Sequence, residues 1–127
     1  MTQPSITAIA TQGMDFERNR LELAALKISL ANTTFSSLLE AESFANSLQA
    51  NRNESMQSFD SSALTIKSIV DKSDPKADAN GSIYKFDIDP THEMATLVSA
   101  TRAYEANVRA YNVNSQMTKA ALEIGGR

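Results

Sequence analysis

The residues that could carry catalysis or bind a metal are few and scattered in this sequence. His92 is the only histidine and there is no cysteine. Zinc sites in proteins use several histidine or cysteine side chains, so this sequence cannot supply such a cluster. Asp71, Asp74 and Asp78 resemble part of a calcium loop, but they lack its spacing and its distal glutamate. We therefore predict no metal site and no cofactor, and we interpret His92 as a surface residue in a first helical turn.

Nucleophilic, phosphate and nucleic-acid chemistry are equally poorly supported. No G-x-S-x-G motif is present. The four glycines, Gly13, Gly81, Gly125 and Gly126, are too dispersed to form a phosphate-binding loop. The net charge is −3, and no basic stripe that could neutralise phosphates occurs. These observations predict a protein that is not an enzyme and does not bind nucleic acid.

Signals for membranes and secretion are missing as well. No run of about 18 apolar residues occurs, so we predict no direct membrane span. The segment Met1–Thr11 lacks the basic start and apolar centre of a cleaved signal peptide. Taken alone, these features predict a cytoplasmic protein.

The elements available to position any functional residue are mainly two long helices. The C-terminal helix is predicted over 89–127, since Asp89 can cap it, Pro90 suits its first position and Gly125-Gly126 ends it. Its first apolar row contains Met94, Leu97, Thr101, Tyr104, Val108, Tyr111, Ser115, Thr118 and Leu122. Its second row contains Ala103, Ala106, Ala110, Val113, Met117, Ala120 and Ile124. Both rows have coiled-coil spacing and lie about 150–180° apart, so the helix should pack on two sides.

The N-terminal segment 1–34 has the same two-sided pattern. One row contains Ile9, Phe16, Leu23 and Leu30, and the other contains Met14, Leu21, Ile28 and Phe35. A helical bundle closed within one chain is the ordinary interpretation of such rows, but it needs more enclosing helices than this sequence supplies. We therefore favour burial between separate molecules. The first five residues are expected to be disordered in the free protein.

The middle region, 35–88, differs in character. Residues 35–49 either extend the first helix or form a separate one, and Asn51–Ser62 is polar enough to be a loop. Ala63–Val70 and Ile83–Ile88 have strand patterns, and Asn80-Gly81 between them is a strong turn signal. The predicted fold is mostly α, with long terminal helices and a small irregular or β-hairpin middle region.

Several motifs resemble those of bacterial flagellar basal-body rod proteins. The main one is Glu93-Met94 followed by the run V-S-A-T-R-A-Y-E-A-N-V over 98–108. The stretch 74–81 is similar to that of proximal-rod members, and 29–34 is similar to the N-terminal motif of the family without its usual P-G-Y continuation. The resemblance covers 6–34 and 74–125.

The resemblance implies a structural subunit of the proximal rod, which transmits torque from the motor to the hook. It implies that the terminal helices pair as an antiparallel coiled coil and assemble with other copies and with neighbouring rod proteins. It also implies passage through the flagellar type III export apparatus without a cleaved signal peptide, and a final place in the periplasmic rod of the basal body. The competing hypothesis is a soluble coiled-coil adaptor or export chaperone that uses one row to bind a client.

The resemblance and the apolar rows together give the predicted subunit-interface residues. The family motifs contribute Leu30, Ala31, Asn32, Tyr104, Glu105, Ala106 and Asn107. The rows contribute Leu23, Ile28, Met94, Leu97, Val108, Ala110, Tyr111, Val113 and Met117. Asn107 falls off both rows, so its side chain should either hydrogen-bond a neighbouring subunit or face solvent.

Overall fold

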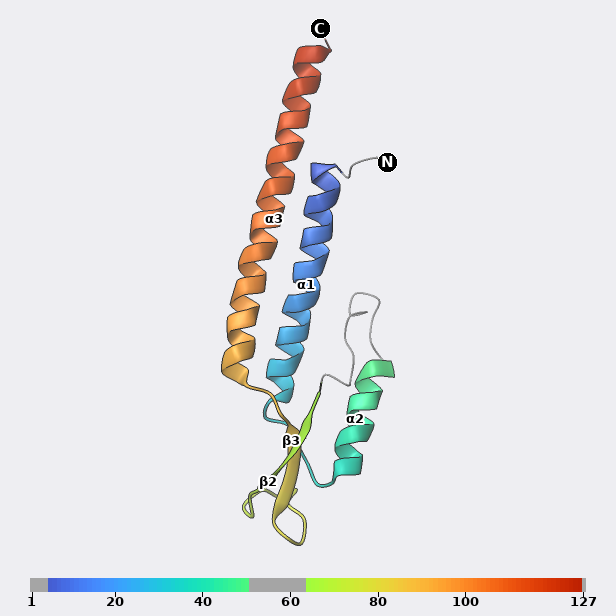
Figure 1. The fold of residues 1–127 in the computed structure, drawn as a ribbon, viewed down its shortest axis with the longest axis vertical. Coiled ribbons are helices and arrows are strands. Elements are labelled where there is room, and N and C mark those ends of the chain that lie inside the picture. Colours follow the sequence, from blue (N-terminus) through green and yellow to red (C-terminus); the bar gives the residue numbers. More distant parts are fainter. Residues whose placement is uncertain (1–4, 51–63, 127) are drawn as a thin grey trace. The chain divides into compact units, whose positions relative to one another are not determined.

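The computed structural model describes residues 5–50 and 64–126. The elements in chain order are α1 (Ile6–Leu30), β1 (Thr34–Phe35), α2 (Leu38–Ala50), β2 (Ile66–Val70), β3 (Ser82–Phe86) and α3 (Pro90–Gly125), as Figure 1 shows. The predicted fold class, mostly helical with a small sheet in the middle, is confirmed. The predicted loop Asn51–Ser62 and the first four of the five residues expected to be disordered lie outside the described residues.

The chain divides into two compact units. We call residues 1–21 and 96–127 the helical unit, and residues 22–95 the sheet unit. Both long helices run through the boundary, so each unit contains a part of α1 and a part of α3.

Helix α3 begins and ends where the sequence predicts. The Thr91 backbone N–H donates to Oδ1 of Asp89 at 3.0 Å, and the Glu93 N–H donates to the Asp89 carbonyl at 3.1 Å. Asp89 is therefore the N-cap, with Pro90 in the first helical position. The helix ends at Gly125.

Helix α1 ends at Leu30, earlier than the sequence boundary at residue 34. The Thr33 N–H donates to the Leu30 carbonyl at 3.1 Å, which closes a turn, and the next two residues form β1. Thr34 pairs with Lys85 and Phe35 with Tyr84 of β3. The backbone N–H and C=O groups of Thr34 and Phe35 therefore serve strand pairing and not a longer helix.

The predicted β-hairpin is present. Strands β2 and β3 pair antiparallel from Ile66 opposite Phe86 to Val70 opposite Ser82. Gly81 has a φ of 76° in the connecting turn, a conformation that glycine adopts without steric cost. Oδ1 of Asp78 accepts from the N–H groups of Asn80 and Ser82, both at 2.9 Å. With β1 added, the sheet has the order β1-β3-β2.

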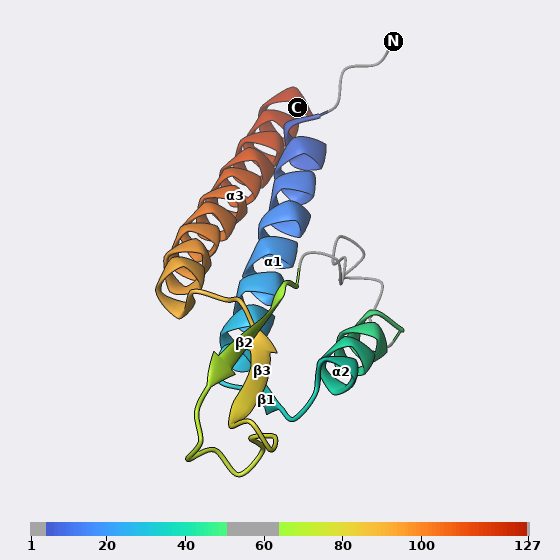
Figure 2. The same ribbon diagram turned by 60° about the horizontal axis from the view of Figure 1, so that its bottom comes forward.

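The sheet unit has an aromatic core beneath α2, which is a separate helix beside the strands (Figure 2). The rings of Phe35 and Phe86 meet edge to face with centroids 5.5 Å apart, and Phe44 of α2 lies 5.4 Å from Phe35. The buried members of this core are Leu30, Phe35, Ala41, Ala45, Leu64 and Phe86. A hairpin is marginally stable alone, so packing against α2 is what makes this one part of a folded unit.

Candidate functional site

Helix α3 has less intrachain cover than α1 or α2. Of its 36 residues, only Ala100 is buried. In the described part of the helical unit, the buried apolar residues are Ala10 of α1 and Ala100 of α3. Two alanines bury little apolar area, so the helical unit lacks a core of large side chains.

The second apolar row of α3 is exposed along most of its length. Ala106 and Ala110 are exposed, and Val113 and Met117 are 54% and 67% exposed. These four residues were predicted to lie in a subunit interface, and the described chain leaves them accessible. Ala103, in the same row, is half-buried.

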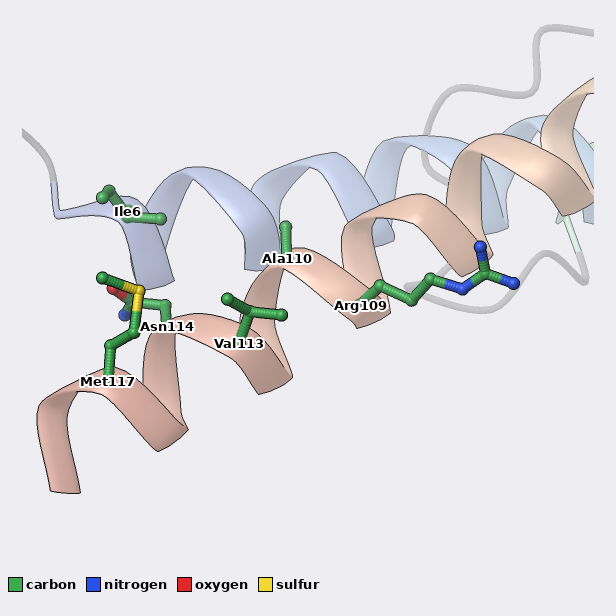
Figure 3. Close-up of a pocket in the computed structure, with 6 residues that line it drawn as sticks. All are labelled: Ile6, Arg109, Ala110, Val113, Asn114 and Met117. Atoms are coloured by element: carbon green, nitrogen blue, oxygen red, sulfur yellow. The ribbon is translucent and has the colours of Figure 1, made fainter. Parts of the chain in front are cut away.

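An open groove of about 370 Å³ lies at one end of this row, between α3 and the first residue of α1. Its lining is Ile6, Arg109, Ala110, Val113, Asn114 and Met117. Figure 3 shows Ile6 facing the side chains of α3, with Arg109 extended along the helix at the other end. The groove is lined mainly by aliphatic groups and has one cation at its edge, so it can take apolar side chains of another helix.

The first apolar row of α3 is partly covered. Leu97, Tyr104 and Val108 are half-buried, whereas Met94 and Tyr111 are exposed. Glu105, between the rows, is exposed. This row therefore contributes to packing within the chain and retains accessible surface at Met94 and Tyr111.

Direct contacts join α1 and α3 within the helical unit. Nδ2 of Asn114 donates to Oγ1 of Thr7 at 2.6 Å. A Cβ atom placed on Gly13 would lie 2.7 Å from Oδ1 of Asn107, so the Asn107 side chain occupies the space that Gly13 leaves open. The partner moves from Asn114 to Asn107 as α1 advances from Thr7 to Gly13, so the helices run antiparallel here.

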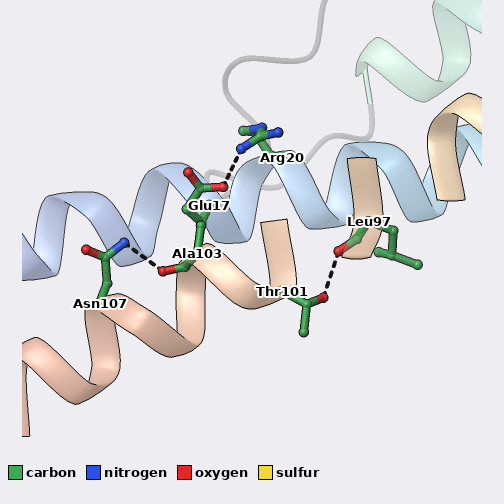
Figure 4. A network of polar contacts seen from close by, with 6 residues as sticks. All are labelled: Glu17, Arg20, Leu97, Thr101, Ala103 and Asn107. Carbon is green, nitrogen blue, oxygen red and sulfur yellow. Dashed lines mark hydrogen bonds and ion pairs between the residues drawn. The ribbon is translucent and has the colours of Figure 1, made fainter. Parts of the chain in front are cut away.

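The polar groups that Figure 4 draws near this contact are bonded within their own helices. Nδ2 of Asn107 donates to the Ala103 carbonyl at 3.0 Å, and Oγ1 of Thr101 donates to the Leu97 carbonyl at 2.8 Å. Glu17 is 9% exposed, and Nη1 of Arg20 donates to its Oε2 at 2.7 Å. Among the described residues, no buried side-chain nitrogen or oxygen is left without a partner.

The predicted interface residues of the N-terminal motif lie in the sheet unit. Leu30 and Ala31 are 5% and 3% exposed, and Leu23 packs against the core that contains Leu30. Ile28 is half-buried and Asn32 is exposed. Only Asn32 of this group is exposed, because the turn after α1 folds the motif into the chain's own core.

Sequence reasoning missed four residues of the helical contact: Thr7, Gly13, Glu17 and Asn114. It also placed Asn107 off both rows, whereas the structure places its side chain against Gly13. Two signals could have revealed this face: Asn107 and Asn114 are one heptad apart, and Gly13 is the only glycine in α1. Asn107 and Asn114 form a polar row of α3 between its two apolar rows.

The described residues contain no group of histidine and carboxylate side chains that could hold a metal ion. None of the helices, over the residues that the structure covers, is long and apolar enough to cross a membrane. One ion pair joins the ends of the long helices in the sheet unit, where Nζ of Lys27 lies 3.5 Å from Oε1 of Glu93.

Comparison with known proteins finds the same family that the sequence motifs resemble. Residues 79–124 match the family described as flagellar basal body rod FlgEFG protein, C-terminal. A protein of Bacillus subtilis (strain 168) named flagellar basal-body rod protein FlgC is 51% identical over 57 residues, which are 45% of this chain and 38% of that protein. No solved structure matches the chain.

Two further relatives have the same name. The Aquifex aeolicus protein is 33% identical over 58 residues, covering 46% of this chain and 43% of its own length. The Salmonella typhimurium protein is 34% identical over 59 residues, covering 46% and 44%. The chain thus spans about two fifths of the length of these curated relatives. The resemblance predicted from the motifs is confirmed, because residues 79–124, which include almost all of α3, match the flagellar basal-body rod family.

Proposed function

We propose that this chain is a noncatalytic structural subunit of the proximal rod of the bacterial flagellar basal body. The observation that carries the proposal is the coincidence of two features in one helix. Residues 79–124 match the rod family, and α3, which makes up most of that segment, has only one buried residue. A helix with this much accessible apolar surface requires partners from other molecules.

In this proposal, copies of the chain and neighbouring rod proteins cover the second row of α3. The contact residues would be the exposed members of the predicted interface: Asn32, Met94, Glu105, Ala106, Ala110, Tyr111, Val113 and Met117. The alanines allow helices to approach closely, while Val113 and Met117 offer apolar side chains at the groove. The long helices of adjacent subunits would then form a coiled-coil layer that is stiff enough to transmit torque to the hook.

The proposal includes a route and a location. The chain would leave the cell through the flagellar type III export apparatus without losing a signal peptide, and would reside in the periplasmic rod. The names of the three relatives support the basal-body location. The export route rests on the family resemblance of the motifs.

Expression in Bacillus subtilis cells that lack their own FlgC tests the proposal. We expect the chain to be present in purified hook–basal bodies and to restore swimming in soft agar. Ala110→Leu should keep the protein soluble but reduce its incorporation and abolish swimming, because overpacking a close contact costs about 1–3 kcal/mol per copy. Ala95→Leu is the matched control, since Ala95 is an exposed alanine of α3 outside both rows.

Three outcomes would contradict the proposal. The first is absence of the unmodified chain from basal bodies despite normal expression. The second is normal swimming with Ala110→Leu, which would mean that the second row does not form a close contact in the assembly. The third is a chain that stays in the cytoplasm as a stable helical dimer bound to a client, which is the behaviour of an adaptor or export chaperone.

A further inference from the structure

We infer that Asn107 and Asn114 fix the antiparallel register of α1 against α3 in the helical unit. This role is independent of the proposed rod function. Both asparagines are half-buried and lie one heptad apart on α3, in the same row as the buried Ala100. A buried asparagine in a coiled coil typically specifies register at some cost in stability.

Each asparagine has a distinct partner on α1. Asn114 donates a hydrogen bond of 2.6 Å to the Thr7 hydroxyl. Asn107 bonds its own helix through the Ala103 carbonyl, and its amide group fills the space beside Gly13. One contact therefore needs a hydroxyl and the other needs a residue without a side chain.

The apolar residues near this contact discriminate poorly between registers. A slip of one heptad that brings Ala110 to the level of Ala103 also brings Tyr111 to the level of Tyr104, so these two side chains are unchanged. The same slip replaces Val108 with Ser115, which removes only a small apolar contact. Packing of these residues alone therefore separates the two registers only weakly.

The asparagines remove this degeneracy. A slip of seven residues would place Asn107 opposite either Ile6 or Arg20, and neither offers the space of Gly13, the only glycine of α1. In one direction Thr7 would face Ala121, which has no amide to donate. In the other direction Asn114 would pass beyond Ile6, where α1 begins. Only the observed register satisfies both asparagines.

Distances between spin labels test this inference on the full chain. The sequence has no cysteine, so Gln12→Cys with Gln116→Cys gives one label on each helix, at exposed positions in the helical unit. Pulsed electron paramagnetic resonance should show one narrow distance for the labelled chain. A slip of one heptad would shift the two labels relative to each other by about 10 Å along the helix axis, and the measured distance would change accordingly.

Two variants and a control decide the result. Asn107→Leu with Asn114→Leu should preserve helix content, because leucine is a better helix former, but should split the distance into two or more populations. The exchange Gly13→Asn with Asn107→Gly, made in the parent chain, should keep one narrow distance. It retains the same glycine–asparagine pair with the two helices reversed. Asn112→Leu, at an exposed position of α3, should leave the distance unchanged.

The inference would be overturned by a single unchanged distance in the double leucine variant. It would equally be overturned if the labelled parent chain showed no defined distance, because the register would then not be fixed in the free protein. Incorporation into basal bodies is a separate measurement. A chain that assembles normally but shows either of these distance results would retain the proposed function and lose this inference.

Discussion

The two units of this protein are built from opposite uses of large apolar side chains. Among its described residues, the sheet unit buries Phe35 and Phe86, and Phe86 has no exposed surface. The helical unit buries only Ala10 and Ala100 among its described apolar residues. It leaves Phe16 62% exposed and also exposes Ile6, Ile9, Val98, Tyr111, Val113, Met117, Leu122 and Ile124.

This difference indicates which unit can be stable without partners. A fully buried phenylalanine or leucine contributes roughly 1.5–3 kcal/mol, whereas ordering one residue costs about 1–2 kcal/mol in backbone entropy alone. The sheet unit has an aromatic core to offset that cost. The helical unit has alanines and polar contacts, so its stability should increase when other chains cover its apolar rows.

The strongest test of the comparison is one substitution made in both units. Phe86→Ala should destabilise the sheet unit by about 3–5 kcal/mol, because it leaves a cavity in the core. Phe16→Ala in the free chain should change stability by no more than about 0.5 kcal/mol, because that ring is mostly in solvent. Urea titrations followed by NMR resonances of each unit would measure both values. Equal losses from the two substitutions would break the comparison.

A double-mutant cycle should measure the coupling between Gly13 and Asn107 in the helical unit. Gly13→Ala alone should destabilise the helical unit by about 1 kcal/mol, because overpacking against Asn107 outweighs the better helix propensity of alanine. With Asn107→Ala also present, the same change should stabilise it by about 1 kcal/mol. Helix content at 222 nm during urea titration measures the coupling.

Gly125→Ala is the control for this cycle, since a Cβ there meets no atom within 4 Å. It should show no coupling to Asn107→Ala. Coupling below about 0.5 kcal/mol between Gly13 and Asn107 would mean that the two residues act independently.

A smaller loss of stability is expected from the N-cap of α3, Asp89, which belongs to the sheet unit. Asp89→Ala removes the acceptor of the Thr91 N–H and should cost about 1 kcal/mol. Asp89→Asn, which keeps an acceptor oxygen, should cost less. Hydrogen exchange of the Thr91 amide should accelerate in the alanine variant alone. Equal acceleration in both variants would show that the carboxylate charge, and not the acceptor, holds the helix start.

Acid should weaken the sheet unit slightly. The Ser36 hydroxyl and N–H both donate to the carboxylate of Glu40, which lowers the pKa of Glu40 below its ordinary 4.5. The Ser73 hydroxyl and N–H likewise lower the pKa of Asp71 below its ordinary 3.8. A lowered pKa gives stability that is complete above the ordinary value and is lost as the pH falls through the folded value.

Stability of the sheet unit should therefore decline as the pH falls below about 4.5. Glu40→Gln should reduce the slope of that decline, and Glu42→Gln, on the exposed side of the same helix, should leave it unchanged. Thermal unfolding at a series of pH values would measure the slope. An identical slope in Glu40→Gln and the parent chain would mean that Glu40 does not contribute to the loss of stability in acid.

Local patterns account for what the sequence predicts correctly. The cap at Asp89, the turn at Asn80-Gly81 and the long helical periods are properties of neighbouring residues, and each is found in the structure. β1 was missed because two residues are too short for a strand pattern. Their pairing with Lys85 and Tyr84 depends on chain segments about 50 residues away.

The contact face of the helical unit was beyond sequence reasoning for the same reason. Asn107 is a neutral polar residue by type, and only the register of α1 brings Gly13 opposite it. The burial of Leu30 and Ala31 likewise follows from the turn and strand after α1, which the helical pattern does not reveal. Predictions based on periodicity identified the exposed row of α3, because exposure there requires no partner within the chain.

The hydrogen bond between Thr7 and Asn114 joins residues 107 positions apart, and this separation has a consequence for the order of folding. When the chain appears from its N-terminus, on a ribosome or from a narrow channel, the first helix emerges long before its partner. With Gly13 in its N-terminal third, that helix is about 1 kcal/mol less favourable than with alanine there, and Asn107 is not yet present to pack against the glycine. Completion of the pair must therefore wait for almost the entire chain, and the N-terminal segment remains easy to thread for most of its passage.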